Sequence, residues 1–262
     1  MNTKEPSWKE VSDIVKKARS ASSPGPNGIP YKKGGVPGFS GCIEHTSIIS
    51  QLIHKAKVNK KDLTVVWLDL ANAYGTVPHM LIQQSLDHNH IPDLFKRIIR
   101  SYLSGIELRF STSTFTTTWQ KLQKEIVTGC TISVILCVMG MDMIIKSGER
   151  DTRGPKTSTD IRQPPNSGFM DDFTITSGTH VQTRWVLMAL EETVTWARMA
   201  FKPRKARVLI IRKGKSTHQI ELKVQGEAIP PIIDNPIKCL GKWYDDSLSD
   251  KNNIRRVEQQ VS

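Results

Sequence analysis

Three aspartates stand among apolar residues, and they are the side chains best suited to do chemistry. Asp69 lies near the end of TVVWLDL (residues 64–70), and Asp171 and Asp172 lie together in GFMDDFTIT (residues 168–176). A carboxylate at the end of a buried strand is costly to desolvate, and two adjacent carboxylates repel each other. If the two strands are neighbours, the three carboxylates converge on one point. Such hard oxygen ligands favour Mg²⁺ over zinc and suit two-metal phosphoryl transfer.

Each acidic signal also has an ordinary structural explanation. An Asp-Asp pair is common in turns, because aspartate side chains bond their own backbone there. Asp69 alone would serve equally well as the cap of a following helix. The metal hypothesis therefore depends on the pairing of the two strands.

Composition indicates a polyanionic partner. The 262 residues include 37 Lys and Arg against 25 Asp and Glu, a formal net charge of +12. Neutralising phosphates is a common use of such a surplus, although a solvated basic surface has the same composition. The hydrophobic fraction of 38% is enough for a core and excludes wholesale disorder.

The sequence predicts an intracellular protein with no membrane span. No run reaches the roughly 18 apolar residues that a span needs, and the opening MNTKEPSWKE lacks the apolar stretch of a signal peptide. Cys42, Cys130, Cys137 and Cys239 never take C-x-x-C spacing, so we expect free thiols in a reducing compartment. Nucleus and cytoplasm are not distinguished.

The elements that would position the aspartates mix helices with hairpins. Helical spacing predicts helices over residues 7–18, around 49–56, from Pro78 onward, from a capping Asp93 to a stop at Gly105, over 131–146 and over 181–200. Apolar or alternating runs predict strands at 64–70, a hairpin over 106–119, two strands meeting at the paired aspartates, and a hairpin over 206–226 turning at 213–215. This order favours an α+β fold over a doubly wound sheet.

The three aspartates lie in the segments LDLANAYGTVPH (68–79) and FMDD (169–172). These and several other segments resemble the motifs of reverse transcriptases, most of all those of non-long-terminal-repeat (LINE-type) retrotransposons. LDLANAYGTVPH and FMDD look like motifs A and C. The other segments follow in the family's order: SSPGPNGIPY (22–31) is similar to the N-terminal motif, TGCTIS (128–133) to motif B, FKPRKAR (201–207) to motif D and KCLGKWYD (238–245) to motif E. The resemblance implies a right-hand polymerase palm, with an antiparallel sheet packed on helices, and RNA-directed DNA synthesis.

The resemblance also implies catalytic roles. Asp69 and Asp171 would hold two Mg²⁺ ions, with Mn²⁺ as an alternative ion, and Asp172 would complete the acidic cluster. The carbonyl of Leu70 would be an extra metal ligand. Lys205 matches the lysine proposed to protonate the leaving pyrophosphate, or it is a plain phosphate-contacting or solvated lysine.

Substrate contacts are implied in the same way. Tyr74 matches the aromatic residue that crowds the sugar 2′ position, or it fills the core. Gly129 and Ser133 match the loop and helix start that seat the nascent base pair and the template. Residues expected to follow the nucleic-acid backbone, or to form only a solvated face, are Lys202, Arg204, Arg207 and Arg212. The implied partners are an RNA template, a DNA primer and deoxynucleoside triphosphates.

The chain departs from the family pattern in places. Tyr31 runs almost directly into Gly34, where the family carries several dozen residues of fingers, and no thumb follows motif E. Motif B reads VTG at 127–129 where Arg-Gln-Gly is commoner, and Gly75 replaces a frequent Asp. We therefore expect a truncated domain, with the fingers mostly missing and the thumb absent. Its expected parts are an N-terminal helix and fingers remnant at 1–33, a palm at 34–215, and the motif E hairpin with the start of a thumb junction at 216–262.

Two functional hypotheses follow, and a third is weaker. The first is a reverse transcriptase palm that transfers nucleotides with two metal ions. The second is a catalytically inactive retroelement fragment that at most binds RNA or DNA through its basic surface. The third is a basic α+β domain with no role in nucleic-acid chemistry.

Overall fold

The protein is described from a computed structural model. It describes residues 41–124, 126, 131–150, 152–169 and 171–249. The chain divides into units Met1–Lys32 and Lys33–Ser262, and all described residues belong to the second. The predicted helix at 7–18 and the segment at 22–31 lie outside the described residues.

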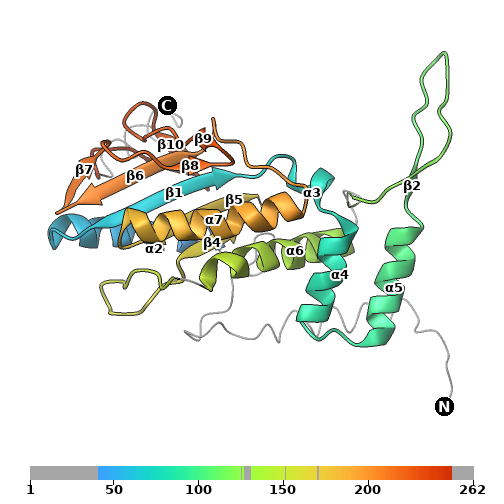
Figure 1. Ribbon diagram of the computed structural model, residues 1–262, viewed down its shortest axis with the longest axis horizontal. Coiled ribbons are helices and arrows are strands. Elements are labelled where there is room, and N and C mark those ends of the chain that lie inside the picture. The colour runs from blue at the N-terminus through green and yellow to red at the C-terminus, as the bar shows by residue number, and fades with distance from the viewer. Residues whose placement is uncertain (1–40, 125, 127–130, 151, 170, 250–262) are drawn as a thin grey trace. The chain divides into compact units, whose positions relative to one another are not determined.

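A five-stranded antiparallel sheet forms the centre of this unit (Figure 1). Its strands run in the order β4-β5-β1-β6-β7. Their bounds are β1 Leu63–Asp69, β4 Asn166–Phe169, β5 Asp172–Ser177, β6 Arg207–Arg212 and β7 Lys215–Thr217. Strand β1 is buried along almost its whole length because it lies between two partners and has covered faces. Its β-branched and aromatic residues suit that position.

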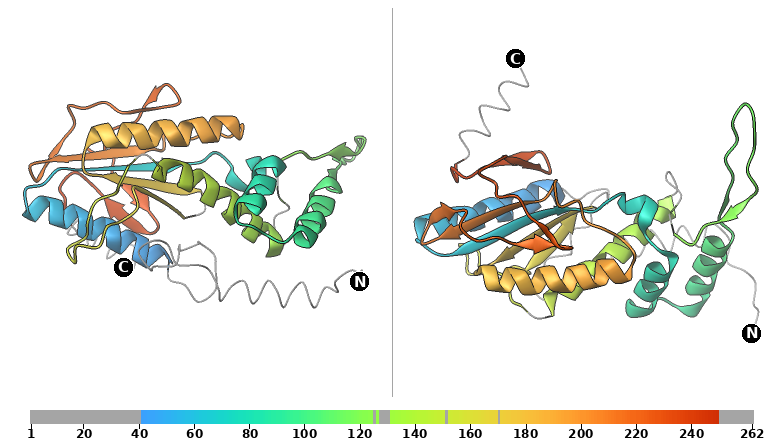
Figure 2. Two further views of the ribbon diagram at one scale, coloured as in Figure 1. Left: turned by 60° about the horizontal axis from the view of Figure 1, so that its bottom comes forward. Right: turned by 45° about the horizontal axis from the view of Figure 1, so that its top comes forward.

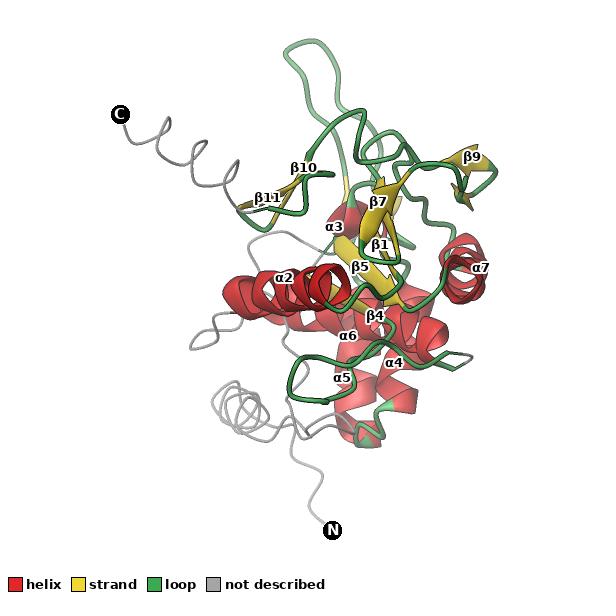
Figure 3. Ribbon diagram, turned by 90° about the vertical axis from the view of Figure 1, so that its left-hand side faces the viewer, coloured by secondary structure: helices red, strands yellow, loops and turns green. Residues whose placement is uncertain are grey.

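Helices cover both faces of the sheet, as the side-chain alternation of β1 requires. Val66 and Leu68 pack with α6 (Thr131–Glu149) and α7 (His180–Trp196). Val65 and Trp67, on the opposite face, pack with α2 (Gly41–Val58) and with the hairpin of β10 (Ile237–Cys239) and β11 (Lys242–Tyr244). Figures 2 and 3 show α2 and α7 on opposite sides of the strands. The predicted α+β fold, with an antiparallel sheet packed on helices, is confirmed.

The described part of the segment between β1 and α6 holds three helices and a hairpin. The elements are α3 (Ala73–Thr76), α4 (His79–His88), α5 (Asp93–Ser104), β2 (Glu107–Leu108) and β3 (Gln120–Lys121). Pro78 precedes α4 and Gly105 follows α5, as predicted. The prediction for Asp93 was wrong, because Pro92 holds the capping position and Asp93 is the first helical residue. The Asp93 carboxylate instead pairs with Lys96 at 2.9 Å.

The C-terminal half follows the sequence prediction with two differences: α7 is shorter, and the hairpin predicted over 206–226 ends at Thr217. Helix α7 begins after Thr179, whose hydroxyl accepts a hydrogen bond from the Gln182 N–H. It ends at Trp196 rather than near residue 200, because Arg198 takes a left-handed φ of 53° that a helix cannot include. The turn between β6 and β7 lies at Lys213 and Gly214, and a further hairpin joins β8 (Lys223–Val224) and β9 (Glu227–Ala228). None of the described helices is long and apolar enough to cross a membrane.

Candidate active site

Strand pairing brings the backbones of the three aspartates together. In the β1–β5 ladder, Asp69 is the partner of Asp172. The Leu70 N–H donates to the Asp171 carbonyl at 3.0 Å. The prediction that these two strands are neighbours is confirmed, so the end of β1 and the β4–β5 turn form one site.

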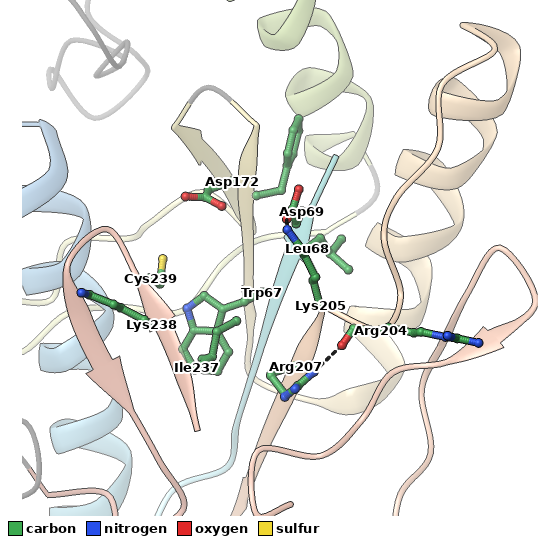
Figure 4. Close-up of a pocket in the computed structure, with 11 residues that line it drawn as sticks. Trp67, Leu68, Asp69, Asp172, Arg204, Lys205, Arg207, Ile237, Lys238 and Cys239 are labelled. Atoms are coloured by element: carbon green, nitrogen blue, oxygen red, sulfur yellow. Dashed lines mark hydrogen bonds and ion pairs between the residues drawn. The ribbon is translucent and has the colours of Figure 1, made fainter. Parts of the chain in front are cut away.

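The three carboxylates do not converge on one point, so that expectation was wrong. In Figure 4, Asp69 lies beside Lys205, while Asp172 points away from it, toward the side on which Cys239 lies. Asp171 is exposed at the turn. Within the described residues, no three His, Cys, Asp or Glu side chains gather as a metal site. Metal binding by Asp69, Leu70, Asp171 and Asp172 therefore stays a prediction.

Two lysines neutralise Asp69 instead. Lys202 Nζ donates to Asp69 Oδ1 at 3.0 Å, and Lys205 Nζ lies 3.5 Å from Oδ2. The backbone explains this contact: the Lys202 N–H donates to the Asp69 carbonyl at 2.8 Å, and Leu70 pairs with Phe201 in an antiparallel bridge. The segment after α7 thus runs along the end of β1 and delivers the cations that the half-buried carboxylate needs.

Asp172 carries the strongest electrostatic signal of the site. Burial, followed by the negative charges of Asp171 and Asp69, raises its pKa from the usual 3.8 to about 6, and Lys202 and Lys205 oppose the rise. A bound cation would relieve the repulsion among these negative charges. Three carboxylates on adjacent backbone positions are also the hard oxygen donors that Mg²⁺ prefers. The chemistry of the donor set therefore fits a divalent cation, although the side chains would have to turn.

A cavity of about 370 Å³ opens beside the acidic residues (Figure 4). Its lining combines two carboxylates with four cationic side chains over an apolar floor: Trp67, Leu68, Asp69, Asp172, Phe173, Arg204, Lys205, Arg207, Ile237, Lys238 and Cys239. The buried Trp67 Nε1 has no hydrogen-bond partner in the described structure. Arg207 is partly committed, because its guanidinium donates to the carbonyls of Arg204 and Asn235 at 2.8 and 3.1 Å. The cavity suits a ligand that carries phosphate.

The remaining predicted residues are only partly placed. Tyr74 lies in α3, but its side chain is outside the description, and Gly129 lies outside the described residues. Ser133 is buried in the first turn of α6, and its hydroxyl lacks a hydrogen-bond partner in the described structure. Arg212 is at the opposite end of β6 from Arg207 and does not line the cavity.

Sequence reasoning missed two residues of the cavity and one ion pair beside it. Trp67 was treated only as part of a buried strand, yet alternation with Leu68 places it on the face that carries the β10–β11 hairpin. Lys238 lies in the motif E-like segment and received no role. Lys202 pairs with Asp69, a contact that the sequence did not indicate, and its expected place on the nucleic-acid backbone or on a solvated face stays a prediction. Only its spacing of three residues from Lys205 could have indicated that both reach one carboxylate.

The sequence matches the family model described as "Reverse transcriptase (RNA-dependent DNA polymerase)" over residues 9–243. The chain belongs to the reverse transcriptase family. No curated protein matches it.

A solved structure of similar fold is apo telomerase from Candida tropicalis truncated from its C-terminal domain. The TM-score is 0.50 and the sequence identity 12%, over 78% of this chain and 40% of the telomerase chain. The reverse transcriptase domain described here therefore spans less than half the length of that telomerase. At this identity, the likeness supports the fold, which is that of a reverse transcriptase palm.

Proposed function

We propose that this reverse transcriptase domain is an RNA-directed DNA polymerase palm of LINE-type retroelement origin. Its substrates would be an RNA template, a DNA primer and deoxynucleoside triphosphates, which implies an intracellular location. We assign residues 34–215 to the palm, 216–262 to the motif E hairpin and thumb junction, and 1–33 to an N-terminal remnant of the fingers. The observation that carries the proposal is the pairing of Asp69 with Asp172, beside the Leu70–Asp171 hydrogen bond.

Two Mg²⁺ ions, or Mn²⁺ as the alternative, fit the donor set. Asp69 and Asp171 would hold them, with Asp172 completing the cluster and the Leu70 carbonyl as an extra ligand. When bound, such ions would lower the pKa of the primer 3′-hydroxyl and stabilise the charge of the triphosphate.

The chain's own side chains would bind and orient the substrates. Lys202 and Lys205 must leave Asp69, and the Lys205 side chain is 66% exposed, so it has room to turn toward a leaving pyrophosphate with its proton on Nζ. Arg204 and Lys238 line the cavity and would contact phosphates. Further substrate contacts are proposed for Tyr74, which would crowd the sugar 2′ position, and for Gly129 and Ser133, which would seat the nascent base pair and template.

Primer extension tests the proposal directly. The full chain would be incubated with a primed RNA template, deoxynucleoside triphosphates and Mg²⁺. We expect extended primer from the wild type and none from the double variant Asp171→Asn, Asp172→Asn. Equal product from both proteins would show that these carboxylates do not carry the reaction.

A second candidate function is RNA or DNA binding without catalysis. The ion pairs of Lys202 and Lys205 with Asp69 favour it, because a carboxylate held by two cations is less available to a metal ion. Fluorescence titration with single-stranded RNA at several salt concentrations distinguishes the two. Binding with a steep salt dependence but no primer extension would favour this candidate, since counterion release alone predicts that dependence.

A further inference from the structure

The hairpin that includes β2 and β3 exposes three aromatic side chains. Phe110, Phe115 and Trp119 are 64%, 60% and 57% exposed. Figures 1 and 2 show this hairpin extending away from the sheet and helices beyond α5. Rings of this size are normally buried, and burying each in a contact would remove a large apolar area from water.

The hairpin holds its shape through its own hydrogen bonds. Ser111 pairs with Thr116, and the Thr117 N–H donates to the Phe110 carbonyl at 2.9 Å. At the tip, the Thr112 hydroxyl accepts from the Phe115 N–H at 3.1 Å. A two-stranded hairpin without a core is marginal by itself, so these bonds stabilise the hairpin that carries the aromatic residues.

Charge and ring stacking add a second observation. Residues 106–122 carry one acidic side chain, the exposed Glu107, against the exposed cations Arg109 and Lys121, and the exposed Lys124 follows. The Arg109 guanidinium carbon lies 4.7 Å from the centre of the Trp119 ring. Aromatic faces combined with cations are the elements with which proteins hold single-stranded nucleic acid, because every base offers a face for stacking.

We propose that residues 106–122 form a stacking platform for single-stranded RNA, outside the cavity that holds Asp69. This inference rests on the proposed function, because the RNA in question is the template. Serine and threonine residues lie between the aromatic residues along the chain, and their hydroxyls can form hydrogen bonds with a polar ligand such as RNA. Duplex RNA is a poor fit, since its bases are already stacked.

The base of the hairpin is tied to the segment that follows Asp69. The His79 N–H donates to the Gln123 carbonyl at 3.1 Å, and Pro78 forms a bridge with Lys124. Pro78 precedes α4 and His79 is its first residue, and only α3 lies between the end of β1 and this point. RNA bound to the hairpin would therefore be connected, through the start of α4, to the segment that follows Asp69.

Fluorescence anisotropy with a labelled, unstructured single-stranded RNA tests the platform on the full chain. We expect the triple variant Phe110→Ala, Phe115→Ala, Trp119→Ala to bind at least about fivefold more weakly, which is the low end for losing one stacked base. Its salt dependence should not change, because no charge is lost. Trp185→Ala, which removes a 51% exposed aromatic on α7, is the matched control and should bind as the wild type does.

A leucine version of the same triple variant separates stacking from general apolar contact. Stacking predicts that leucine, like alanine, weakens RNA binding. The platform is overturned if the alanine variant binds RNA as the wild type does, if leucine restores binding fully, or if the wild type does not bind the RNA. It is also overturned if the variant loses binding only to phosphatidylcholine–phosphatidylserine vesicles.

The double variant Asp171→Asn, Asp172→Asn separates this inference from the proposed function. It should lose primer extension and bind the RNA at least as tightly as the wild type does, because it removes only negative charge. If primer extension fails in every protein while the aromatic variant still loses affinity, the proposed function fails and RNA contact by the hairpin stands.

Discussion

At the scale of single residues, lysine and a divalent cation would compete for the carboxylate of Asp69. Its ion pair with Lys202 is only partly buried, with side-chain exposures of 37% for the lysine and 21% for the aspartate. Pairs of this kind contribute about 0.2–1 kcal/mol. A divalent cation could therefore displace the lysine, but it must first overcome that contribution.

Removing Lys202 should therefore strengthen metal binding. We expect Lys202→Met to raise the affinity for Mn²⁺ by up to about fivefold, the equivalent of roughly 1 kcal/mol. The loss of the free Mn²⁺ signal in electron paramagnetic resonance measures binding without requiring activity. Lys223→Met, which removes a lysine paired with Glu221, is the control and should leave Mn²⁺ affinity unchanged. Equal affinities for wild type and Lys202→Met would contradict competition at Asp69.

The raised pKa of Asp172 makes stability depend on pH. Because this pKa is about 6 in the folded chain and near 3.8 when unfolded, the folded state binds the proton more tightly. Stability contributed by the protonated form is therefore complete below about pH 4 and is lost as pH rises toward 6. The residue is only partly buried, so solvent screening reduces the effect to the order of 1 kcal/mol.

Asp172→Asn should remove this loss, because the amide keeps the shape of the carboxyl group without its charge. In chelator-treated buffer, urea unfolding should show the variant to be more stable than the wild type above pH 6. The difference should shrink as pH falls from 6 to 4. A constant difference between the two proteins across that range would show that Asp172 titrates normally.

Local sequence was sufficient to find the acidic residues but not their partners. Asp69 and the Asp171–Asp172 pair stand out because polar residues interrupt apolar strands. Lys202 lies 133 residues from Asp69 along the chain, and their contact follows from the Leu70–Phe201 bridge, which no local pattern reveals. The direction of the aspartate side chains was equally impossible to predict from sequence, because strand pairing fixes backbone positions while neighbouring residues decide the rotamer.

At the scale of helices and strands, the sequence predicted the middle of each element better than the residues at which it begins and ends. The buried run of β1 and the apolar α6 follow from residue type and spacing alone. Ends depend on single residues: Asp93 looks like a cap, but Pro92 takes the extended conformation in that place. Likewise, Arg198 ends α7 through its positive φ, although arginine is a good helix former.

Two hairpin turns, Lys213-Gly214 and Gln225-Gly226, allow a test of how closely one turn packs on its neighbours. Gly214, in the β6–β7 turn, and Gly226, in the β8–β9 turn, have φ values of 78° and 81°. A Cβ on Gly214 would lie 2.7 Å from the Lys57 carbonyl oxygen at the end of α2, whereas one on Gly226 would meet nothing within 4 Å. Alanine costs about 1 kcal/mol in backbone strain at either turn, and Gly214→Ala must also displace backbone.

We therefore expect Gly214→Ala to lower the free energy of unfolding by about 2 kcal/mol or more, and Gly226→Ala by about 1 kcal/mol. Urea unfolding of both variants measures the difference. Equal losses would mean that the β6–β7 turn does not pack on the α2–β1 connection as closely as described.

At the scale of the whole molecule, the excess positive charge can act on RNA in two ways: through direct contacts with phosphates and through general attraction. The net charge of +12 attracts any polyanion, wherever the charges lie. The cavity beside the aspartates brings together Arg204, Lys205 and Lys238, which we propose as direct phosphate contacts. Only direct phosphate contacts release condensed counterions, so the salt dependence of binding distinguishes the two.

We expect the triple variant Arg204→Gln, Lys205→Gln, Lys238→Gln to reduce the slope of log affinity against log salt by about 2 for single-stranded RNA, since each lost phosphate contact changes it by about 0.7. The matched variant Arg97→Gln, Lys215→Gln, Lys223→Gln removes the same charge from exposed positions on α5, β7 and β8. It should lower affinity slightly at low salt and leave the slope nearly unchanged. If both variants reduce the slope equally, the cavity is no more of a nucleic-acid contact than the rest of the basic surface, because general attraction does not depend on which three charges are removed.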